Sequence, residues 1–471
     1  MNTITYSLIM IVVLMLMTGI LLPLIFQMTY YMVRGRRKLC SSNIAAETYP
    51  EITIIVPIRN ENLDTILGLI DNILKLNYPK EYFEVIIVSD DERRYFEIIR
   101  EAVFKKIRNK NVKLSIVRRP VNVGYKAGAL NYALKFSKGE YIVVLDADSR
   151  FSSDYLVKLV KVVSESKCDA VMSKWVPSNI NNSLLSEALG YVKKFVVETL
   201  FKRRFMSLGY CSIAGSGFII KKNVLFKLGG FNEKSILEDV ELGLKMLISG
   251  LKVCFCESVS TYLEVPSTFY AYKIQQERWA YGSSQLLREY FTKILRSKMS
   301  FLKKIENLTY LSQYLSPFFL IMLNVLILLL TFMLEKDIIS YVFNYAFALW
   351  LLVSGSYALI FTKYFKGKMG YFRTLRILGR TAGLTFMLAP LLAFSVIKGL
   401  FNLPFKWHVT PKGLCMVSRE KYVYEISFLF IFFLLTMLVA YIYGYATVTL
   451  WYILQLSSII YSVNMLFRGK V

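Results

Sequence analysis

Long uncharged runs of apolar residues constrain this chain more than any other feature of its sequence. Five runs are long enough to cross a bilayer, and they cover Tyr6–Phe26, Leu315–Leu334, Ile338–Phe361, Ile426–Tyr443 and Ala446–Phe467. Because a helix of roughly 20 apolar residues spans the hydrocarbon layer, these runs predict membrane-spanning helices. They divide the chain into an N-terminal helix with its basic flank (1–38), a central polar region (39–310) and a C-terminal membrane region (311–471).

Basic residues beside these runs predict the side of the membrane on which each flank lies. Arg34, Arg36, Arg37 and Lys38 follow the first run, and no basic residue precedes it. The positive-inside rule then places the N-terminus outside and the central region in the cytosol. A cleaved signal peptide is disfavoured because no small-residue cleavage site ends the run. We therefore expect a multi-pass protein of the plasma membrane with a cytosolic central region.

The overall charge and the few metal-binding side chains narrow the classes of partner. The chain carries 58 Lys and Arg residues against 33 Asp and Glu, a formal net charge of +25, which favours anionic membrane lipids and phosphate-bearing ligands. Nucleic acid is not an expected partner, because no zinc-finger spacing or RNA-binding signature accompanies the charge. Six cysteines without a C-x-x-C pair and the single histidine His408 make a zinc site unlikely to form, and cytosolic cysteines should stay reduced.

One apolar segment does not fit the pattern of spans. Ala382–Ile397 is short for a span and contains Pro390. If it crossed the membrane, the following loop with Lys406 and Lys412 would lie outside, against the positive-inside rule. We therefore predict an interfacial or re-entrant segment at 382–400 and a cytosolic loop at 401–424, with a sixth span as the alternative.

The central region is predicted to be a soluble α/β domain. Short β-branched runs alternate with amphipathic stretches of helix length, and these runs are Ile52–Val56, Val85–Val88, Lys113–Val117 and Tyr141–Leu145. This alternation is typical of a mostly parallel sheet, in which ligands bind beyond the carboxyl ends of the strands. Leu184–Phe205, with its five basic residues, is expected to be an amphipathic helix on the membrane face or on the solvated surface.

Carboxylates follow two of the predicted strands. Asp146 and Asp148 come after the strand that ends at Leu145, and two such oxygen ligands are suited to Mg²⁺ or Mn²⁺ beside a diphosphate. Asp90 and Asp91 follow the strand that ends at Val88, where a carboxylate can accept hydrogen bonds from a base or ribose. Taken singly, each pair is also compatible with a turn or with a helix cap.

Three further elements combine polar side chains with helices. A glycine-containing segment from Gly124 to Asn131 opens a helix and offers Lys126 for phosphate charge. Glu238 and Asp239 precede a helical stretch, where an ordinary capping role is the simplest interpretation. A third element, Gln275-x-x-Arg278-Trp279, lies in another helical stretch, where the aromatic ring would usually serve packing.

Together, in this order, the elements resemble family 2 processive glycosyltransferases of the cellulose, hyaluronan and chitin synthase type. The matching positions lie between residues 50 and 290 and are Pro57, Asn60, Glu61, Asp90, Asp91, Gly124, Lys126, Asn131, Asp146, Asp148, Gly215, Ser216, Gly217, Glu238, Asp239, Gln275, Arg278 and Trp279. Beyond them, Trp407, Thr410 and Lys412 resemble the gating segment F-x-V-T-x-K of cellulose synthases, with Trp in place of Phe. Leu237 departs from the usual Thr, and a cyclic-dinucleotide-binding extension is not found.

The resemblance implies a GT-A type α/β fold and an inverting transfer from a nucleotide-diphosphate sugar, expected to be a UDP-sugar, to a growing β-linked polysaccharide. It implies that Asp146 and Asp148 bind the metal ion and that Asp239, beside Glu238, is the general base. Donor contacts are implied for Pro57, Asn60, Glu61, Asp90, Asp91, Lys126, Asp146, Gln275, Arg278, Trp407, Thr410 and Lys412, and acceptor contacts for Trp279, Gly215, Ser216 and Gly217. The membrane helices would form a channel for the polymer.

Two alternatives remain beside polysaccharide synthesis. The first is an enzyme that adds a single sugar to a glycolipid or a polyprenyl-linked acceptor, although such enzymes generally lack Q-x-x-R-W. The second is a non-catalytic transporter that only binds nucleotide sugars, which would not need a base beside a metal site. The motifs do not name the sugar, and Lys174, Trp175 and Cys211 are further candidates for contacts that select it.

Overall fold

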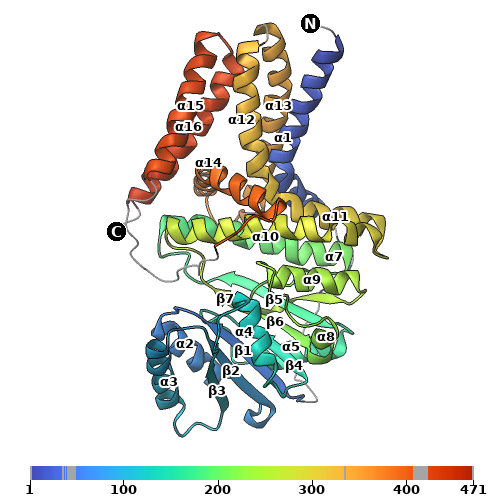
Figure 1. Ribbon diagram of the computed structural model, residues 1–471, viewed down its shortest axis with the longest axis vertical. Helices are drawn as coiled ribbons and strands as arrows, with labels where there is room; N and C mark the ends of the chain where they lie inside the picture. The colour runs from blue at the N-terminus through green and yellow to red at the C-terminus, as the bar shows by residue number, and fades with distance from the viewer. Residues whose placement is uncertain are drawn as a thin grey trace.

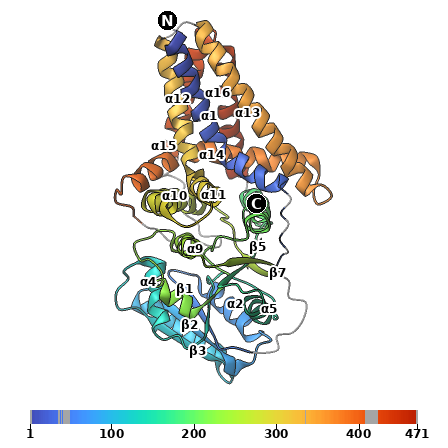
Figure 2. The same ribbon diagram turned by 90° about the vertical axis from the view of Figure 1, so that its right-hand side faces the viewer.

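Three layers follow one another along the long axis of the molecule. The computed structural model describes residues 3–468 except positions 34, 36, 38, 40–48, 334–335 and 407–422. A β-sheet with its covering helices forms the lower layer, helices that lie crosswise form the middle, and upright helices form the upper layer (Figure 1). The same order is seen after a quarter turn in Figure 2.

The lower layer contains a seven-stranded sheet in the order β3-β2-β1-β4-β6-β5-β7. Its strands are β1 (Ile52–Ile58), β2 (Phe83–Ser89), β3 (Lys113–Arg118), β4 (Tyr141–Val144), β5 (Ala170–Pro177), β6 (Phe218–Lys221) and β7 (Val253–Leu263). Neighbouring strands pair in parallel except at β6, which runs antiparallel to β4 and β5. The four strands predicted from the sequence correspond to β1–β4, and the predicted mixed α/β fold is confirmed.

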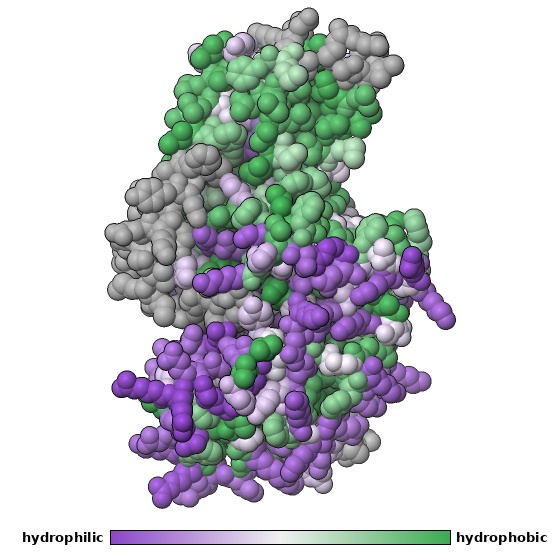
Figure 3. Space-filling view, in the orientation of Figure 1, coloured by the Kyte–Doolittle hydropathy of each residue, from purple (hydrophilic) through white to green (hydrophobic). Residues whose placement is uncertain are grey.

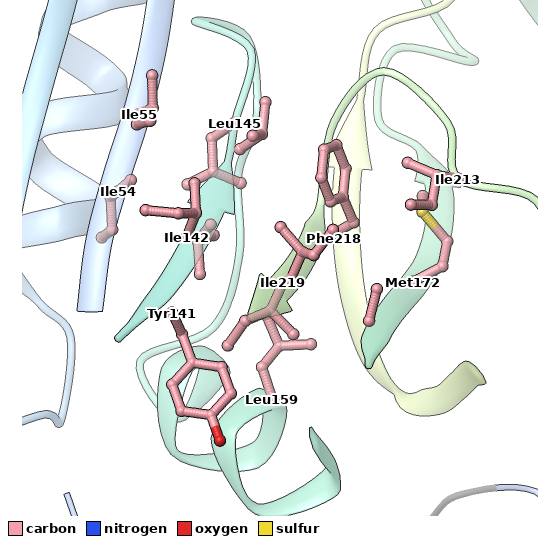
Figure 4. Close-up of a cluster of buried hydrophobic side chains, with 14 of the residues drawn as sticks. Ile54, Ile55, Tyr141, Ile142, Leu145, Leu159, Met172, Ile213, Phe218 and Ile219 are labelled. Carbon is pink, nitrogen blue, oxygen red and sulfur yellow. The ribbon is translucent and has the colours of Figure 1, made fainter. Parts of the chain in front are cut away.

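Apolar side chains bury the central strands of this sheet on both faces, which is why these strands read as continuous apolar runs. Ile54, Ile142 and Phe218, from β1, β4 and β6, are buried in one cluster (Figure 4). The helices of this layer are α2 (Leu63–Leu74), α3 (Arg93–Ile107), α4 (Tyr125–Leu134), α5 (Tyr155–Glu165), α8 (Lys222–Lys227) and α9 (Glu238–Ile248). The sheet therefore holds its strand ends, and the loops that follow them, in fixed positions.

The middle layer separates the sheet from the upright helices. It consists of α6 (Leu184–Val196), a π-helical segment (Val197–Arg203), α7 (Arg204–Leu208), α10 (Phe269–Arg296) and α11 (Phe301–Ser312). The predicted helical stretch over 184–205 is present as α6, the π-helical segment and α7, and its place on the membrane face stays a prediction. It packs against α14 and α16 of the membrane region, and Phe195 and Arg204 are buried.

The upper layer contains α1 (Thr3–Met32), α12 (Ser316–Met333), α13 (Lys336–Phe365), α15 (Val423–Ile442) and α16 (Ala446–Arg468). Among the described residues, five stretches are long and apolar enough to cross a membrane, namely Tyr6–Met32, Phe301–Met333, Ile338–Phe365, Tyr371–Leu400 and Ala446–Leu466. The apolar part of α15, Phe430–Ile442, is shorter. Hydrophobic residues dominate the visible face of the upper layer and hydrophilic residues that of the sheet layer (Figure 3).

Helix α14 (Tyr371–Leu400) joins two features that the sequence suggested separately. The basic residues Arg373, Arg376 and Arg380 and the segment 382–397 belong to one continuous helix that includes Pro390. α14 is long enough to span a membrane, but it lies below the upright helices and packs against α10, α12 and α16 (Figure 1). The interfacial or re-entrant placement of this segment stays a prediction.

The cysteines contradict one expectation. Cys168 and Cys254 form a disulfide across a Cα–Cα distance of 6.1 Å. The expectation of reduced thiols rested only on the cytosolic compartment. It took no account of the parallel pairing of β5 and β7, which brings these two residues together.

Candidate active site

One cavity of about 910 Å³ extends from the carboxyl ends of the sheet strands to the upright helices. Its lower end is lined by residues that the sequence singled out, most of them charged: Pro57, Glu61, Asp90, Lys126, Asp146, Asp148, Gly215, Glu238, Asp239, Gln275, Arg278 and Trp279. Its upper end is lined mainly by apolar and small side chains of α1, α13 and α14, such as Leu24, Ala358 and Leu378. Polar side chains and an apolar surface therefore line the same cavity.

The loop after β2 supports the part of the cavity nearest β1. Asp90 accepts hydrogen bonds from the guanidinium of Arg119 at 2.6 and 2.5 Å, and both side chains are almost fully buried. Asp91 accepts from the Ser89 hydroxyl at 2.7 Å and from the backbone N–H of Asn60 at 2.5 Å. Among the described residues that line the cavity, Asp90 is present but Asn60 and Asp91 are not, so these two hold the loop in place. Sequence reasoning missed Arg119, because nothing in its local pattern marks it.

Asp146 and Asp148 follow β4 and both line the cavity. The backbone N–H of Asp146 donates to the Ser216 hydroxyl at 2.9 Å, and a carboxylate oxygen of Asp148 accepts from the backbone N–H of Glu264 at 3.3 Å. The described residues contain no cluster of three metal-binding side chains. Two carboxylates nevertheless suit Mg²⁺ or Mn²⁺, which commonly take one or two protein carboxylates and complete their shell with substrate phosphates and water.

Lys126 connects three parts of the site. Its ammonium donates to Asp146 and to the carbonyl of Gly215, each at 2.7 Å, and lies 3.9 Å from Glu238. Burial acts to lower the pKa of Lys126, but the neighbouring carboxylates outweigh it and the pKa is raised. Gly124, with φ of 74°, begins α4 in the left-handed region and directs Lys126 toward the sheet. This cation is therefore held charged beside the carboxylates of Asp146 and Glu238.

Glu238 and Asp239 form the first turn of α9. The N-cap of this helix is Leu237, so neither carboxylate is its cap. An oxygen of Asp239 accepts a hydrogen bond from the backbone N–H of Gly215. Burial, together with the nearby charge of Asp239, raises the pKa of Glu238 to about 7. A raised pKa of this kind in a cavity wall is typical of functional sites.

The segment 215–217 faces the cavity only through its first residue. Ser216 accepts from the backbone of Asp146 through its hydroxyl and from Trp175 Nε1 through its carbonyl, the latter at 2.7 Å. Gly217 has φ of 80°, and a Cβ atom there would lie 2.4 Å from Thr261. Ser216 and Gly217 thus fix the shape of the site from behind, whereas Gly215 lies in its wall.

Aromatic rings and one further cation complete the wall toward the membrane. Gln275, Arg278 and Trp279 of α10 all line the cavity, as the sequence motif required. Lys193 of α6 lies 4.9 Å from the ring centroid of Trp279 and 4.6 Å from that of Trp175. Sequence reasoning placed Lys193 on an outer helix face; only the packing of α6 reveals its position in the site. The gating-like residues Trp407, Thr410 and Lys412 lie outside the described residues.

Comparison with protein families gives two matches. Residues 53–228 match glycosyl transferase family 2, and residues 141–362 match glycosyl transferase family group 2. A protein named probable glycosyltransferase from Sulfolobus acidocaldarius is 30% identical over 456 residues, which are 94% of this chain and 96% of that protein. The similarity thus includes the sheet and the upright helices.

Other relatives match over about half their length. A beta-monoglucosyldiacylglycerol synthase from Nostoc sp. is 28% identical over 57% of this chain and 56% of its own. A probable glucomannan 4-beta-mannosyltransferase from Oryza sativa is 29% identical over 55% of this chain and 46% of its own. A mannosyltransferase from Pyrobaculum calidifontis, solved with GDP-Man and Mn²⁺, has a similar fold, with a TM-score of 0.55 and 19% identity over 83% of this chain and 99% of its own.

Proposed function

Because this chain belongs to glycosyltransferase family 2, we propose that it transfers a sugar from a nucleotide-diphosphate donor, with inversion, to a hydroxyl group of a lipid-anchored acceptor. The transferase activity follows from the family. The stereochemical course and the kind of acceptor are proposals from the geometry of the site and from the sequence resemblance.

Donor binding is assigned to the lower end of the cavity. The base and ribose would lie beside Pro57, Glu61 and Asp90, and the diphosphate beside Lys126 and Arg278. A Mg²⁺ or Mn²⁺ ion held by Asp146 and Asp148 would supply positive charge against the leaving diphosphate. The Pyrobaculum mannosyltransferase, with its bound GDP-Man and Mn²⁺, supports this class of donor and metal.

Transfer itself needs a base and a positioned acceptor. Asp239 would take the proton of the acceptor hydroxyl. At the same time the hydroxyl oxygen would bond to the anomeric carbon of the donor sugar, and the bond from that carbon to the diphosphate would break. The Gly215 backbone N–H orients this carboxylate. Trp279 would pack against the acceptor's polar end, and holding the two reactants together removes much of the entropic barrier.

The proposal of a lipid acceptor rests on the residues that line the cavity. Asp239 and Trp279 share it with Leu24 of α1, Ala358 of α13 and Leu378 of α14. Gln27, Ser354, Thr381 and Thr385 add a few polar groups, but most of this wall is apolar, and an acyl or isoprenoid chain would bury apolar surface there. The glycolipid synthase from Nostoc is consistent with such an acceptor.

Polysaccharide synthesis is the second candidate, and the element Gln275-x-x-Arg278-Trp279 in the cavity wall favours it. The glucomannan relative from Oryza sativa points the same way. Processive addition and export through the helices would require the cavity to continue across the membrane.

We also propose that the sheet layer is cytosolic and that the helices lie in the plasma membrane, as the charge flanks suggest. The exposed loop residue Lys110 offers a test. A Lys110→Cys variant should resist an impermeant thiol reagent in intact cells, and efficient labelling from outside would reverse the orientation.

The acceptor is tested with radiolabelled nucleotide sugars, purified full-length protein and a membrane lipid extract. We expect the label to enter the organic phase as lipids that carry one added sugar, and an Asp239→Asn variant gives the background. Label in long water-soluble chains would support the second candidate and contradict the first.

A further inference from the structure

Lys193 is a charged residue in an otherwise apolar helix face. The residues of α6 that line the cavity are Leu189, Val192, Lys193 and Val196, which recur at the spacing of one helical face. Leu200 of the π-helical segment extends this apolar lining. The ammonium group of Lys193 thus belongs to a cavity wall in which the neighbouring residues of the same helix face are apolar.

Two tryptophans hold this ammonium group in place. The ring centroids of Trp175 and Trp279 lie 4.6 and 4.9 Å from Nζ, within the range of cation–π attraction. Trp175 is itself fixed, because its Nε1 donates to the Ser216 carbonyl at 2.7 Å. The cation therefore has a defined position beside the ring that is assigned to the acceptor.

Three other cations of this region have carboxylate partners, whereas Lys194, the next residue of α6, lies over the ring of Tyr191. Lys202 lies 2.7 Å from Glu257, Arg203 lies 2.8 Å from Glu198, and Arg204 lies 2.7 Å from Glu306. Among the described residues, no carboxylate lies within ion-pair distance of Lys193. Asp239 is near enough to favour its charged form, but burial dominates and lowers the pKa of Lys193 to about 8. The protein thus leaves this cation available to a ligand that enters the cavity.

We infer that Lys193, between Trp175 and Trp279, binds a phosphate group of the lipid acceptor whose apolar chain lies along α1, α13 and α14. The inference rests on the proposed lipid acceptor and adds the chemical class of its head group. A partly desolvated ammonium gains most from an anion, because hydrogen bonds between charged groups are stronger than those to neutral ones. A neutral head group would leave the cation without a counter-charge.

The rival explanation is that Lys193 only sets the orientation of Trp279 through cation–π attraction. In that case the charge of the lipid would not matter, and every acceptor would be affected alike when the lysine is replaced. The two explanations therefore differ in their dependence on phosphate.

A matched pair of lipids separates them. Phosphatidic acid and diacylglycerol with the same bromine-labelled acyl chains differ only in the phosphate, and bromine in the cavity would quench the fluorescence of its tryptophans. Binding is measured on the full-length protein in neutral detergent micelles, for the wild type, Lys193→Gln, Lys193→Arg and Lys194→Gln. Lys194 is the matched control, because it is the next residue of α6 and does not line the cavity.

We expect Lys193→Gln to weaken binding of phosphatidic acid by at least about tenfold, the loss of one charge-assisted contact, and to change diacylglycerol binding by less than about twofold. Lys193→Arg should restore most of the affinity, and Lys194→Gln should bind as the wild type does. Equal losses for both lipids, or no loss for either, would overturn the phosphate site while leaving the lipid acceptor intact. If the wild type itself binds neither lipid, the proposed lipid acceptor fails, and the inference fails with it.

Discussion

Lys126 links the part of the site that is proposed to bind the metal ion with the part that is proposed to hold the base. It contacts Asp146 and the Gly215 carbonyl, while the N–H of the same glycine holds Asp239. Gly215 therefore fixes the separation between the group that faces the donor phosphates and the group that faces the acceptor. A substitution at any of these positions would shift the others, so the effects of single substitutions should not be additive. Double-mutant cycles are needed to separate them.

Asp239→Asn separates base catalysis from structure. The amide oxygen of Asn can still accept the hydrogen bond from Gly215, so the fold and the binding of donor should persist, whereas the proton acceptor is lost. General-base catalysis contributes about 10²–10⁴-fold, so turnover should fall at least about 100-fold. Calorimetric donor affinity and turnover are measured on one preparation; unchanged turnover in a folded variant would remove Asp239 from the mechanism.

Glu238 gives the metal-free protein a pH-dependent stability. Burial raises the pKa of Glu238 from 4.5 to about 7 in the folded protein. The folded protein therefore binds this proton more tightly than the unfolded chain does. The contribution of Glu238 is complete below about pH 4.5 and is lost as the pH rises through 7. The midpoint temperature of thermal unfolding should therefore decrease as the pH is raised from 5 to about 7.5. In the Glu238→Gln variant this decrease should be smaller. An identical slope in the variant would exclude Glu238 as its source.

At the scale of elements, a buried ion pair fastens the middle layer together. Arg204 of α7 pairs with Glu306 of α11 at 2.7 and 2.9 Å, and Tyr30 of α1 donates to the same carboxylate at 2.9 Å. Tyr210 donates to it as well. Three segments that are distant in the sequence thus meet at one carboxylate beneath the cavity.

Removing one member of this pair should be costly. Glu306→Ala leaves Arg204 buried without its counter-charge, a change that typically destabilises by about 3–5 kcal/mol. Glu97→Ala is the control, because its exposed pair with Arg100 should contribute at most about 1 kcal/mol. The free energy of unfolding of both variants is measured by denaturant titration in detergent. Equal effects of the two substitutions would show that the Arg204–Glu306 pair does not fasten these helices.

Local patterns predicted the strands β1–β4 and the carboxylates after them, because a strand and the loop at its end are consecutive in the sequence. They also brought Gln275, Arg278 and Trp279 together on one helix. They could not place Lys193 beside Trp279, since that contact depends on how α6 packs against the membrane region. The Asp90–Arg119 pair and the Cys168–Cys254 disulfide were missed for the same reason: each joins elements whose proximity the sheet order creates.

At the scale of the whole molecule, the active site lies where the sheet layer meets the apolar layer. Its lower end presents charges suited to a water-soluble donor, and its upper end presents a surface suited to a membrane-dissolved chain. Such a position would let the two proposed substrates reach the proposed base, Asp239, from opposite directions. The activity should therefore depend on the upper part of the cavity as well as on the charged residues at its lower end.

A bulky side chain in the upper part tests this dependence. Ala358 of α13 lines the cavity, whereas its neighbour Leu359 does not line it and is largely exposed on the apolar surface. Ala358→Trp should obstruct the path of a lipid chain and raise the Michaelis constant for the lipid acceptor at least about tenfold, the equivalent of roughly 1.4 kcal/mol of lost binding. Leu359→Trp adds a ring of the same kind toward the surrounding lipid and should leave that constant near its wild-type value. With both proteins in the same detergent, the constant for the acceptor is measured at saturating donor and the constant for the donor at saturating acceptor. If the two variants behave alike, or if Ala358→Trp changes only the constant for the donor, the acceptor does not occupy the space between α1, α13 and α14.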